Sequence, residues 1–207
     1  EGLIQIFKSL GADVVISGGQ TMNPSTEDFV QAVEQVQAEK IIILPNNGNI
    51  VMAAKQAADV LDTPVNVVPT KNISQGMSAL LSFNPDLSLA ENVAQMNLVK
   101  DEVKAGEVTQ AVRNTDIEGI NIKQGHFMGI FDGKIVLAAP DLKDAVLQLL
   151  TKMIDEESEI VTLICGKEAN EEQAEQIKEE IESRFADIEV EIYQGGQPFY
   201  PYLVSVE

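Results

Sequence analysis

The chain has 207 residues, with 14 Lys or Arg against 33 Asp or Glu, so its formal net charge at pH 7 is −19. A negative field of this size repels phosphodiester backbones and acidic lipid headgroups, which argues against nucleic-acid and membrane-surface binding and favours basic partners. Hydrophobic residues make up 44% of the chain, which excludes disorder. A chain of this length buries roughly 70% of its unfolded surface, so one large domain or two small ones form without a disulfide, metal or cofactor.

Cys165 and His126 are the only cysteine and the only histidine. A lone cysteine excludes an internal disulfide and a Cys-rich metal site, and we expect Cys165 to be a buried thiol on a strand. His126 follows Gly125 and precedes an apolar run, so we interpret it as a residue at a loop edge rather than a catalytic acid or base.

The ends and apolar runs of the chain bear on its location. No apolar run approaches the roughly 20 residues of a membrane span, and no signal peptide is visible, so a cytoplasmic location is expected. Because the chain opens at Glu1 without Met, we expect a fragment of a longer protein.

The first half of the chain alternates short apolar runs with polar turns and helical patterns. Ser25 and Asp28 predict a capping box, and the uninterrupted apolar run at 41–44 is typical of a strand covered on both faces. Three strands that are each followed by a turn and a helix imply parallel pairing with right-handed crossovers. In chain order we expect a helix at 3–10, a strand at 14–16, a turn at 17–24, a helix at 26–36, a strand at 41–44, a turn at 45–49, a helix at 50–61, a strand at 65–68, a turn at 69–75 and a helix towards residue 83.

The second half has a different pattern, which begins after a connecting helix that ends near residue 105. Asp132-Gly133 is typical of a type I′ hairpin turn between two strands. The expected elements are strands at 108–112, 117–122, 127–131 and 134–138, a helix at 141–154, a strand at 160–165, a helix at 170–185 and strands at 188–193 and 203–206. We therefore predict an α/β chain of two lobes: residues 1–105, a parallel sheet with flanking helices, and residues 106–207, a mixed sheet with helices.

Polar turns follow the three predicted strands of the first lobe. Ligands and partners dock at the carboxyl edge of open parallel sheets, so these turns form the candidate functional region. They carry amides and hydroxyls, with Lys71 as the only charge, and contain neither a carboxylate nor a histidine. The Gly18-Gly19 pair lacks the surrounding pattern of a nucleotide-binding loop.

Two interpretations of the amide-rich turns stay open. The segment 46–49 is either a helix cap with a tight turn, because Asn and Gly tolerate left-handed backbone, or a binding segment that acts with the similar turn at 20–23. The candidate partner-binding residues are Gln20, Thr21, Asn23, Asn46, Asn47 and Asn49.

Acidic and aromatic residues also gather in the second lobe. The carboxylates on one face of the helix at 170–185 are interpreted as a solvated surface. Phe199, Tyr200 and Tyr202 follow a Gly-rich turn, where they either line a pocket or fill the core.

Two long runs resemble a known family: SGGQTMNPST at 17–26 and ILPNNGNI at 43–50. They are similar to the C-terminal region of the large subunit of fatty acid kinase, which is a DAK2/DhaL-type protein of Gram-positive bacteria, and the match spans essentially the whole chain. Gly48 stands where many relatives are expected to have Lys. The order of elements also resembles the DegV-type, or EDD, fold of the fatty-acid-binding subunit of this kinase.

The resemblance also marks differences from the lipid binders. Their Ser/Thr/Gly-rich run that holds the acyl carboxylate is replaced here by the segment 46–49. The segment 195–200 occupies the region of their later Gly/His/Thr turn. These replacements argue against fatty acid binding by this chain.

The resemblance implies a function for the fragment. In that family ATP and magnesium belong to an N-terminal kinase domain that is absent here, so no catalytic residue, metal ligand or cofactor is expected in these 207 residues. The C-terminal region is expected to recruit the fatty-acid-loaded binding subunit, so that the kinase domain converts the acyl carboxylate to acyl phosphate for phospholipid synthesis. The alternative is a domain that itself binds a lipid or anion between its lobes. Whether the parent is a homodimer stays open.

Overall fold

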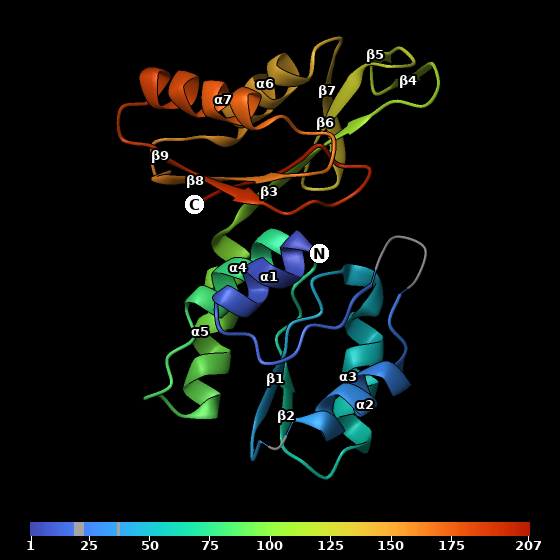
Figure 1. The fold of residues 1–207 in the computed structure, drawn as a ribbon, viewed down its shortest axis with the longest axis vertical. Helices are drawn as coiled ribbons and strands as arrows, with labels where there is room; N and C mark the ends of the chain where they lie inside the picture. Colours follow the sequence, from blue (N-terminus) through green and yellow to red (C-terminus); the bar gives the residue numbers. More distant parts are fainter. Residues whose placement is uncertain (19–22, 37) are drawn as a thin grey trace. The chain divides into compact units, whose positions relative to one another are not determined.

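The computed structural model describes residues 1–18, 23–36 and 38–207. They divide into two compact units, an N-terminal unit, Ile4–Val103, and a C-terminal unit, Lys104–Glu207 with Glu1–Leu3. Figure 1 traces both units in sequence colours. The first helix, α1 (Gly2–Ser9), contributes its first two residues to the C-terminal unit.

The described part of the N-terminal unit is built of helices around two short strands. The strands pair in parallel, with Ile41 opposite Val65 and Ile43 opposite Val67. The capping box is confirmed: Ser25 Oγ accepts the Asp28 N–H at 3.3 Å, and Asp28 Oδ2 accepts the Ser25 N–H at 2.7 Å. After α1 the elements are α2 (Thr26–Gln35), β1 (Ile41–Ile43), the 3₁₀ helix η1 (Gly48–Ile50), α3 (Val51–Val60), β2 (Val65–Val67), α4 (Ile73–Leu81) and α5 (Leu89–Glu102).

The prediction of a strand at 14–16 is wrong. This segment has no strand partner among the described residues, and Val14 is 43% exposed. Ile16 nevertheless packs against the core around Phe29. A run of β-branched residues becomes a strand only where a neighbouring strand can share its hydrogen bonds, and the local sequence does not reveal that partner. The described sheet has only two strands, and β1 is half-buried along its length rather than fully buried as predicted.

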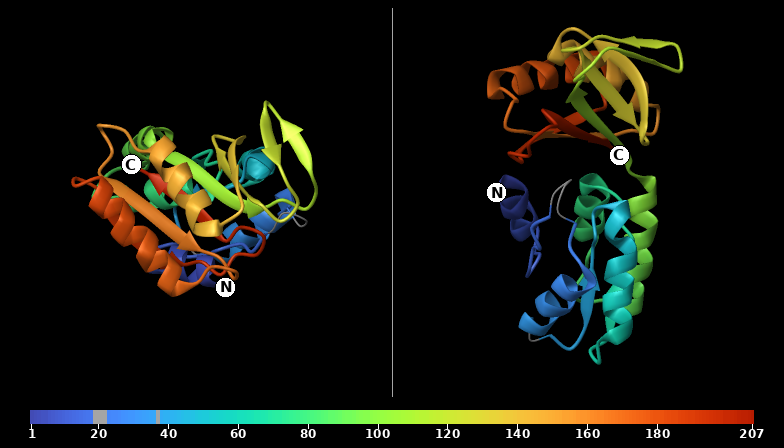
Figure 2. Two further views of the ribbon diagram at one scale, coloured as in Figure 1. Left: turned by 90° about the horizontal axis from the view of Figure 1, so that it is seen from above. Right: turned by 90° about the vertical axis from the view of Figure 1, so that its right-hand side faces the viewer.

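The C-terminal unit contains a six-stranded mixed sheet in the order β7-β6-β3-β10-β8-β9. Only β8 and β9 pair in parallel, so the predicted mixed sheet with helices is confirmed. Helices α6 and α7 lie on one face of this sheet (Figures 1 and 2), and Leu149 and Ile177 are fully buried there. Its elements are β3 (Lys104–Gln110), β4 (Thr115–Ile117), β5 (Ile120–Ile122), β6 (Phe127–Phe131), β7 (Lys134–Ala139), α6 (Leu142–Met153), β8 (Ile160–Cys165), α7 (Glu171–Arg184), β9 (Glu189–Gln194) and β10 (Tyr202–Val206).

The C-terminal unit has two tight hairpin turns, of which the sequence predicts one and misses the other. Asp132 and Gly133 have φ values of 50° and 73°, as the predicted type I′ turn between β6 and β7 requires. The single strand predicted at 117–122 is wrong, because Glu118 and Gly119, with φ values of 50° and 82°, turn the chain between β4 and β5. Glu at the first position of such a turn is a weaker signal than Asp, because its longer side chain is less suited to left-handed backbone.

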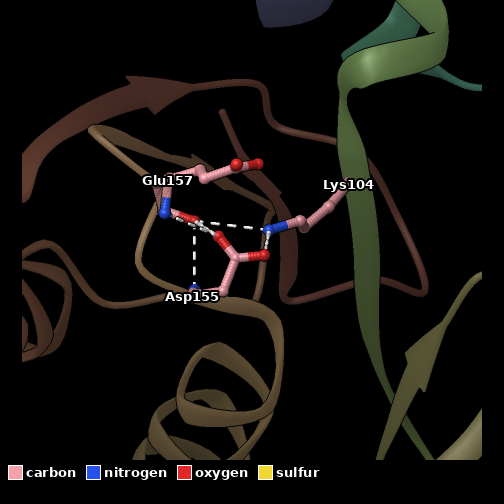
Figure 3. Close-up of polar contacts among 4 residues, drawn as sticks. Lys104, Asp155 and Glu157 are labelled. Carbon is pink, nitrogen blue, oxygen red and sulfur yellow. Dashed lines mark hydrogen bonds and ion pairs between the residues drawn. The ribbon is translucent and has the colours of Figure 1, made fainter.

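An ion pair fixes the start of β3 to the turn after α6, as Figure 3 shows. Lys104 Nζ contacts the Asp155 carboxylate, which also accepts hydrogen bonds from Ser158 Oγ at 2.9 Å and from the Glu157 N–H at 3.2 Å. The hydrogen bond from Lys104, followed by that from Ser158, lowers the pKa of Asp155. The ionised carboxylate is therefore the form that the folded state prefers.

Asp155→Asn is expected to lower the thermal unfolding temperature modestly at pH 7. Because the folded-state pKa of Asp155 lies below its unfolded value, the stabilisation is present above the unfolded pKa and is lost as the pH falls through the folded pKa. The gap between variant and wild type should therefore close below about pH 4. Thermal unfolding at several pH values measures this gap, with the exposed Asp116→Asn on β4 as the control. A gap that is independent of pH would contradict the expectation.

Candidate partner-binding site

The loops that follow β1 and β2 meet at the carboxyl edge of the two strands. The Asn46 N–H donates to Thr70 Oγ1 at 2.9 Å, and the Thr70 hydroxyl donates to Asn46 Oδ1 at 2.8 Å. The Gly48 N–H donates to the Lys71 carbonyl at 3.2 Å. Thr70 is fully buried, so it joins the two loops from inside the unit. The structure thus brings together two of the three predicted turns.

Asn46 has a structural role in this edge. Its φ of 58° lies in the left-handed region, which Asn tolerates better than most residues. Its side-chain amide lies directly against Gly76 of α4, where a Cβ would overlap Asn46 Oδ1. Its Oδ1 is therefore held between Thr70 and Gly76, although the residue as a whole is only half-buried.

Of the neighbouring amide side chains, two cap helices and one is exposed to solvent. Asn47 Oδ1 accepts the Asn49 N–H at 2.9 Å and caps η1, as the capping interpretation predicts. Asn72 Oδ1 accepts the Gln75 N–H at 2.9 Å and caps α4. Asn49 itself is exposed and leaves its side chain available at the edge.

The first amide-rich turn is described only in part. Gln20 and Thr21 lie outside the described residues, whereas Asn23 is exposed just before the cap of α2. Of the six predicted residues, the structure brings Asn46, Asn47 and Asn49 together in one loop.

The sequence does not single out Thr70 as a central residue of this edge. Its role depends on a bond to Asn46, 24 residues earlier in the chain. Ser74 and Ser78 of α4 are also buried close by in the sequence. A polar residue between an apolar strand and a helix cap is the only local signal, and it does not distinguish Thr70 from its neighbours.

Cys165 and His126 lie where the sequence places them. Cys165 is 1% exposed on β8, and burial, followed by the nearby Glu171 and Glu175 carboxylates, raises the pKa of its thiol to about 11. The thiol therefore stays protonated at neutral pH. His126 directly precedes β6, and its carbonyl accepts the Ala111 N–H at 2.8 Å.

Metal-binding clusters and membrane-spanning helices are absent from the parts of the chain that the structure describes. No group of three or more His, Cys, Asp or Glu side chains in these parts has an arrangement that could hold a metal ion. Among the same residues, no helix combines the length and apolar character needed to cross a bilayer.

Comparison with known sequences yields a match over the full chain. The model of the "FakA-like" fatty acid kinase C-terminal family matches residues 1–207. Protein YloV of Bacillus subtilis (strain 168) is 52% identical over 207 residues, which are 100% of this chain and 37% of YloV. An uncharacterised protein of Staphylococcus aureus (strain USA300) is 49% identical over 207 residues, which are 38% of its length. The chain thus spans little more than a third of these relatives.

Solved structures share the fold at low sequence identity. The Streptococcus pneumoniae Fak B3 protein loaded with linoleic acid has a TM-score of 0.65 and 16% identity, over 89% of this chain and 76% of that one. A fatty-acid-binding DegV family protein from Thermus thermophilus has a TM-score of 0.66 and 13% identity, over 100% of this chain and 85% of that one. These likenesses confirm the predicted DegV-like α/β fold.

Proposed function

Since the chain belongs to the FakA-like C-terminal family, we propose that it is the part of a two-component fatty acid kinase that docks the fatty-acid-binding subunit. The docked subunit presents its acyl carboxylate to a DAK2/DhaL-type kinase domain elsewhere in the parent protein. ATP and magnesium belong to that domain, and the fragment itself carries out no phosphoryl transfer.

We place the docking edge where the loops after β1 and β2 are joined, because this junction gives exposed side chains a fixed position. Thr70 and Asn46 fix the two loops to each other, so the neighbouring exposed Asn49 has a rigid support. Rigid polar groups lose little conformational entropy on binding, which favours their use in recognition. The net charge of −19 supports attraction of a basic surface on the partner.

A second candidate function is direct binding of a lipid or anion. The observation in its favour is the burial of the Thr70 and Ser74 hydroxyls beside the carboxyl edge of β1 and β2. The Thr70 hydroxyl, however, already donates its only proton to Asn46 Oδ1. It has no second proton for an acyl carboxylate, so docking is the better-supported function.

Titration of the chain with the cognate fatty-acid-binding subunit, with and without bound fatty acid, tests the proposed function. Calorimetry should detect binding of the loaded subunit, and free fatty acid alone should give no heat of binding. Absence of binding to both forms of the subunit would contradict the docking function. Binding of the fatty acid by the chain alone would favour the second candidate.

Asn23→Ala with Asn49→Ala is expected to weaken docking without a loss of stability. Both residues are exposed, whereas Asn46 is unsuitable because it supports the loop. Each lost hydrogen bond is worth about 0.5–1.5 kcal/mol, so the Kd should rise by between about two- and tenfold per amide. The exposed Asn121→Ala on β5 is the control. An unchanged Kd in the double variant would show that these amides do not contact the partner.

A further inference from the structure

Residues 195–201, here called the Phe199 loop, join β9 to β10 across the carboxyl end of β8. Backbone hydrogen bonds connect this loop to the residues at that end. Four hydrogen bonds make the connection: Gly195 N–H and Gly196 N–H to the Cys165 carbonyl, both at 2.9 Å, Lys167 N–H to the Gln197 carbonyl at 3.0 Å, and Gly166 N–H to the Pro201 carbonyl at 2.8 Å.

Side chains add further hydrogen bonds to those of the backbone. Gln197 is 8% exposed, and its Nε2 donates to the Ile164 carbonyl at 2.9 Å and to the Tyr200 carbonyl at 3.2 Å. The Thr109 hydroxyl at the end of β3 donates to the Phe199 carbonyl at 2.7 Å. Strands β3 and β8 and the turn after β8 thus support the Phe199 loop through hydrogen bonds.

The aromatic ring at the tip of this loop points outward. Phe199 is 65% exposed and has a φ of 69°, a left-handed conformation that is an outlier for a bulky residue. Tyr202, three residues later, fills the core instead. A mostly exposed aromatic side chain on strained backbone contributes little to the stability of the fold, and such strain is concentrated at functional sites.

Acidic residues lie on the segment that supports the Phe199 loop. The segment that bonds to the loop through Gly166 and Lys167 continues with the exposed Glu168, Glu171 and Glu172. Residues 166–175, which follow the carboxyl end of β8, contain 4 Glu against 1 Lys. An exposed aromatic ring beside an acidic segment matches a partner surface that is apolar with basic residues at its edge.

We propose that the Phe199 loop is a docking anchor whose ring inserts into an apolar pocket bordered by Lys and Arg on the partner protein. The proposal rests on the proposed function, because the partner is taken to be the fatty-acid-binding subunit. Buried aromatic anchors carry much of the affinity of protein interfaces, while charged borders mainly raise the association rate. The ring therefore sets how long the complex lasts, and the carboxylates set how fast it forms.

Two variants of Phe199 distinguish the contribution of the ring to binding from the effect of the strained backbone. Phe199→Ala and Phe199→Gly both remove the ring, but Gly also relieves the left-handed strain and should leave the chain at least as thermostable as wild type. Both should raise the Kd for the loaded fatty-acid-binding subunit at least about tenfold, mainly through faster dissociation. Leu98→Ala is the control, because Leu98 on α5 is also 65% exposed, and its Kd should stay within about twofold of wild type.

Surface plasmon resonance against the immobilised loaded subunit measures both rates. Gln in place of Glu168, Glu171 and Glu172 should slow association and reduce its dependence on salt between about 0.05 and 0.5 M. If wild type binds and Phe199→Gly binds within about twofold of it, the anchor is wrong while the docking function stands. If wild type does not bind the loaded subunit, the proposed function and the anchor both fail.

Discussion

Thr70→Val is expected to destabilise the N-terminal unit by about 2–4 kcal/mol, because it leaves both the Asn46 N–H and the Asn46 Oδ1 without their partner. Val has nearly the shape of Thr, so the packing around this fully buried position should change little. A loss of this size lowers the unfolding temperature of a unit of about 100 residues by roughly 10 °C or more. The loop after β1 should also become mobile, and with it the exposed amide of Asn49.

Thr70→Ser is the matched control for this substitution. It keeps the hydroxyl that bridges the two loops and removes only a methyl group, so it should cost about 1 kcal/mol. Thermal unfolding and amide hydrogen exchange report on the two variants together. Equal unfolding temperatures for Thr70→Val and wild type would show that the bridge contributes nothing to stability.

Gly166→Ala is expected to displace the Phe199 loop. A Cβ at this position would overlap the Tyr200 carbonyl oxygen and lie 2.8 Å from the Gln197 carbonyl oxygen, and both are backbone atoms that cannot rotate away. Steric insertions of this kind cost about 1–3 kcal/mol and shift the backbone. Because two backbone N–H groups of the loop bond to the Cys165 carbonyl, the Cys165 thiol should become more accessible once the loop moves.

The rate at which a thiol reagent modifies Cys165 measures this displacement. Wild type should react slowly under native conditions, because Cys165 is 1% exposed and its pKa is raised to about 11. Gly166→Ala should react faster and should also dock more weakly. For the thiol reaction Gly48→Ala is the control, since a Cβ there meets only the Lys71 side chain, at 4.0 Å. A slow reaction in Gly166→Ala would mean that the loop keeps its place.

Features coded by neighbouring residues are predictable from the sequence. The capping box of Ser25 and Asp28 and the Asp132-Gly133 turn depend on contacts within a few residues, and both occur as expected. The segment 14–16 has the composition of a strand, but a strand requires a partner that no local pattern reveals. Strand pairing is decided by the whole sheet.

The candidate site shows the same division between local and distant contacts. The capping role of Asn47 follows from its position before η1. The local pattern allows Asn46 to be either a cap or a binding residue, but it forms a bridge to Thr70, a role that needs knowledge of how β1 and β2 pair. The exposed ring of Phe199 and the buried ring of Tyr202 are likewise indistinguishable until the path of the loop into β10 is known.

The central place of β10 has a consequence for the folding kinetics of the C-terminal unit. The antiparallel strands β3, β6 and β7 and the parallel pair β8–β9 are joined only through β10, which pairs with β3 on one side and β8 on the other. The pairing of Lys104 with Val206 closes a very long loop, and such distant contacts form slowly. Until they form, β3 and β8 expose unpaired edges that invite aggregation. The insertion of one five-residue strand therefore sets the time for which this unit is vulnerable.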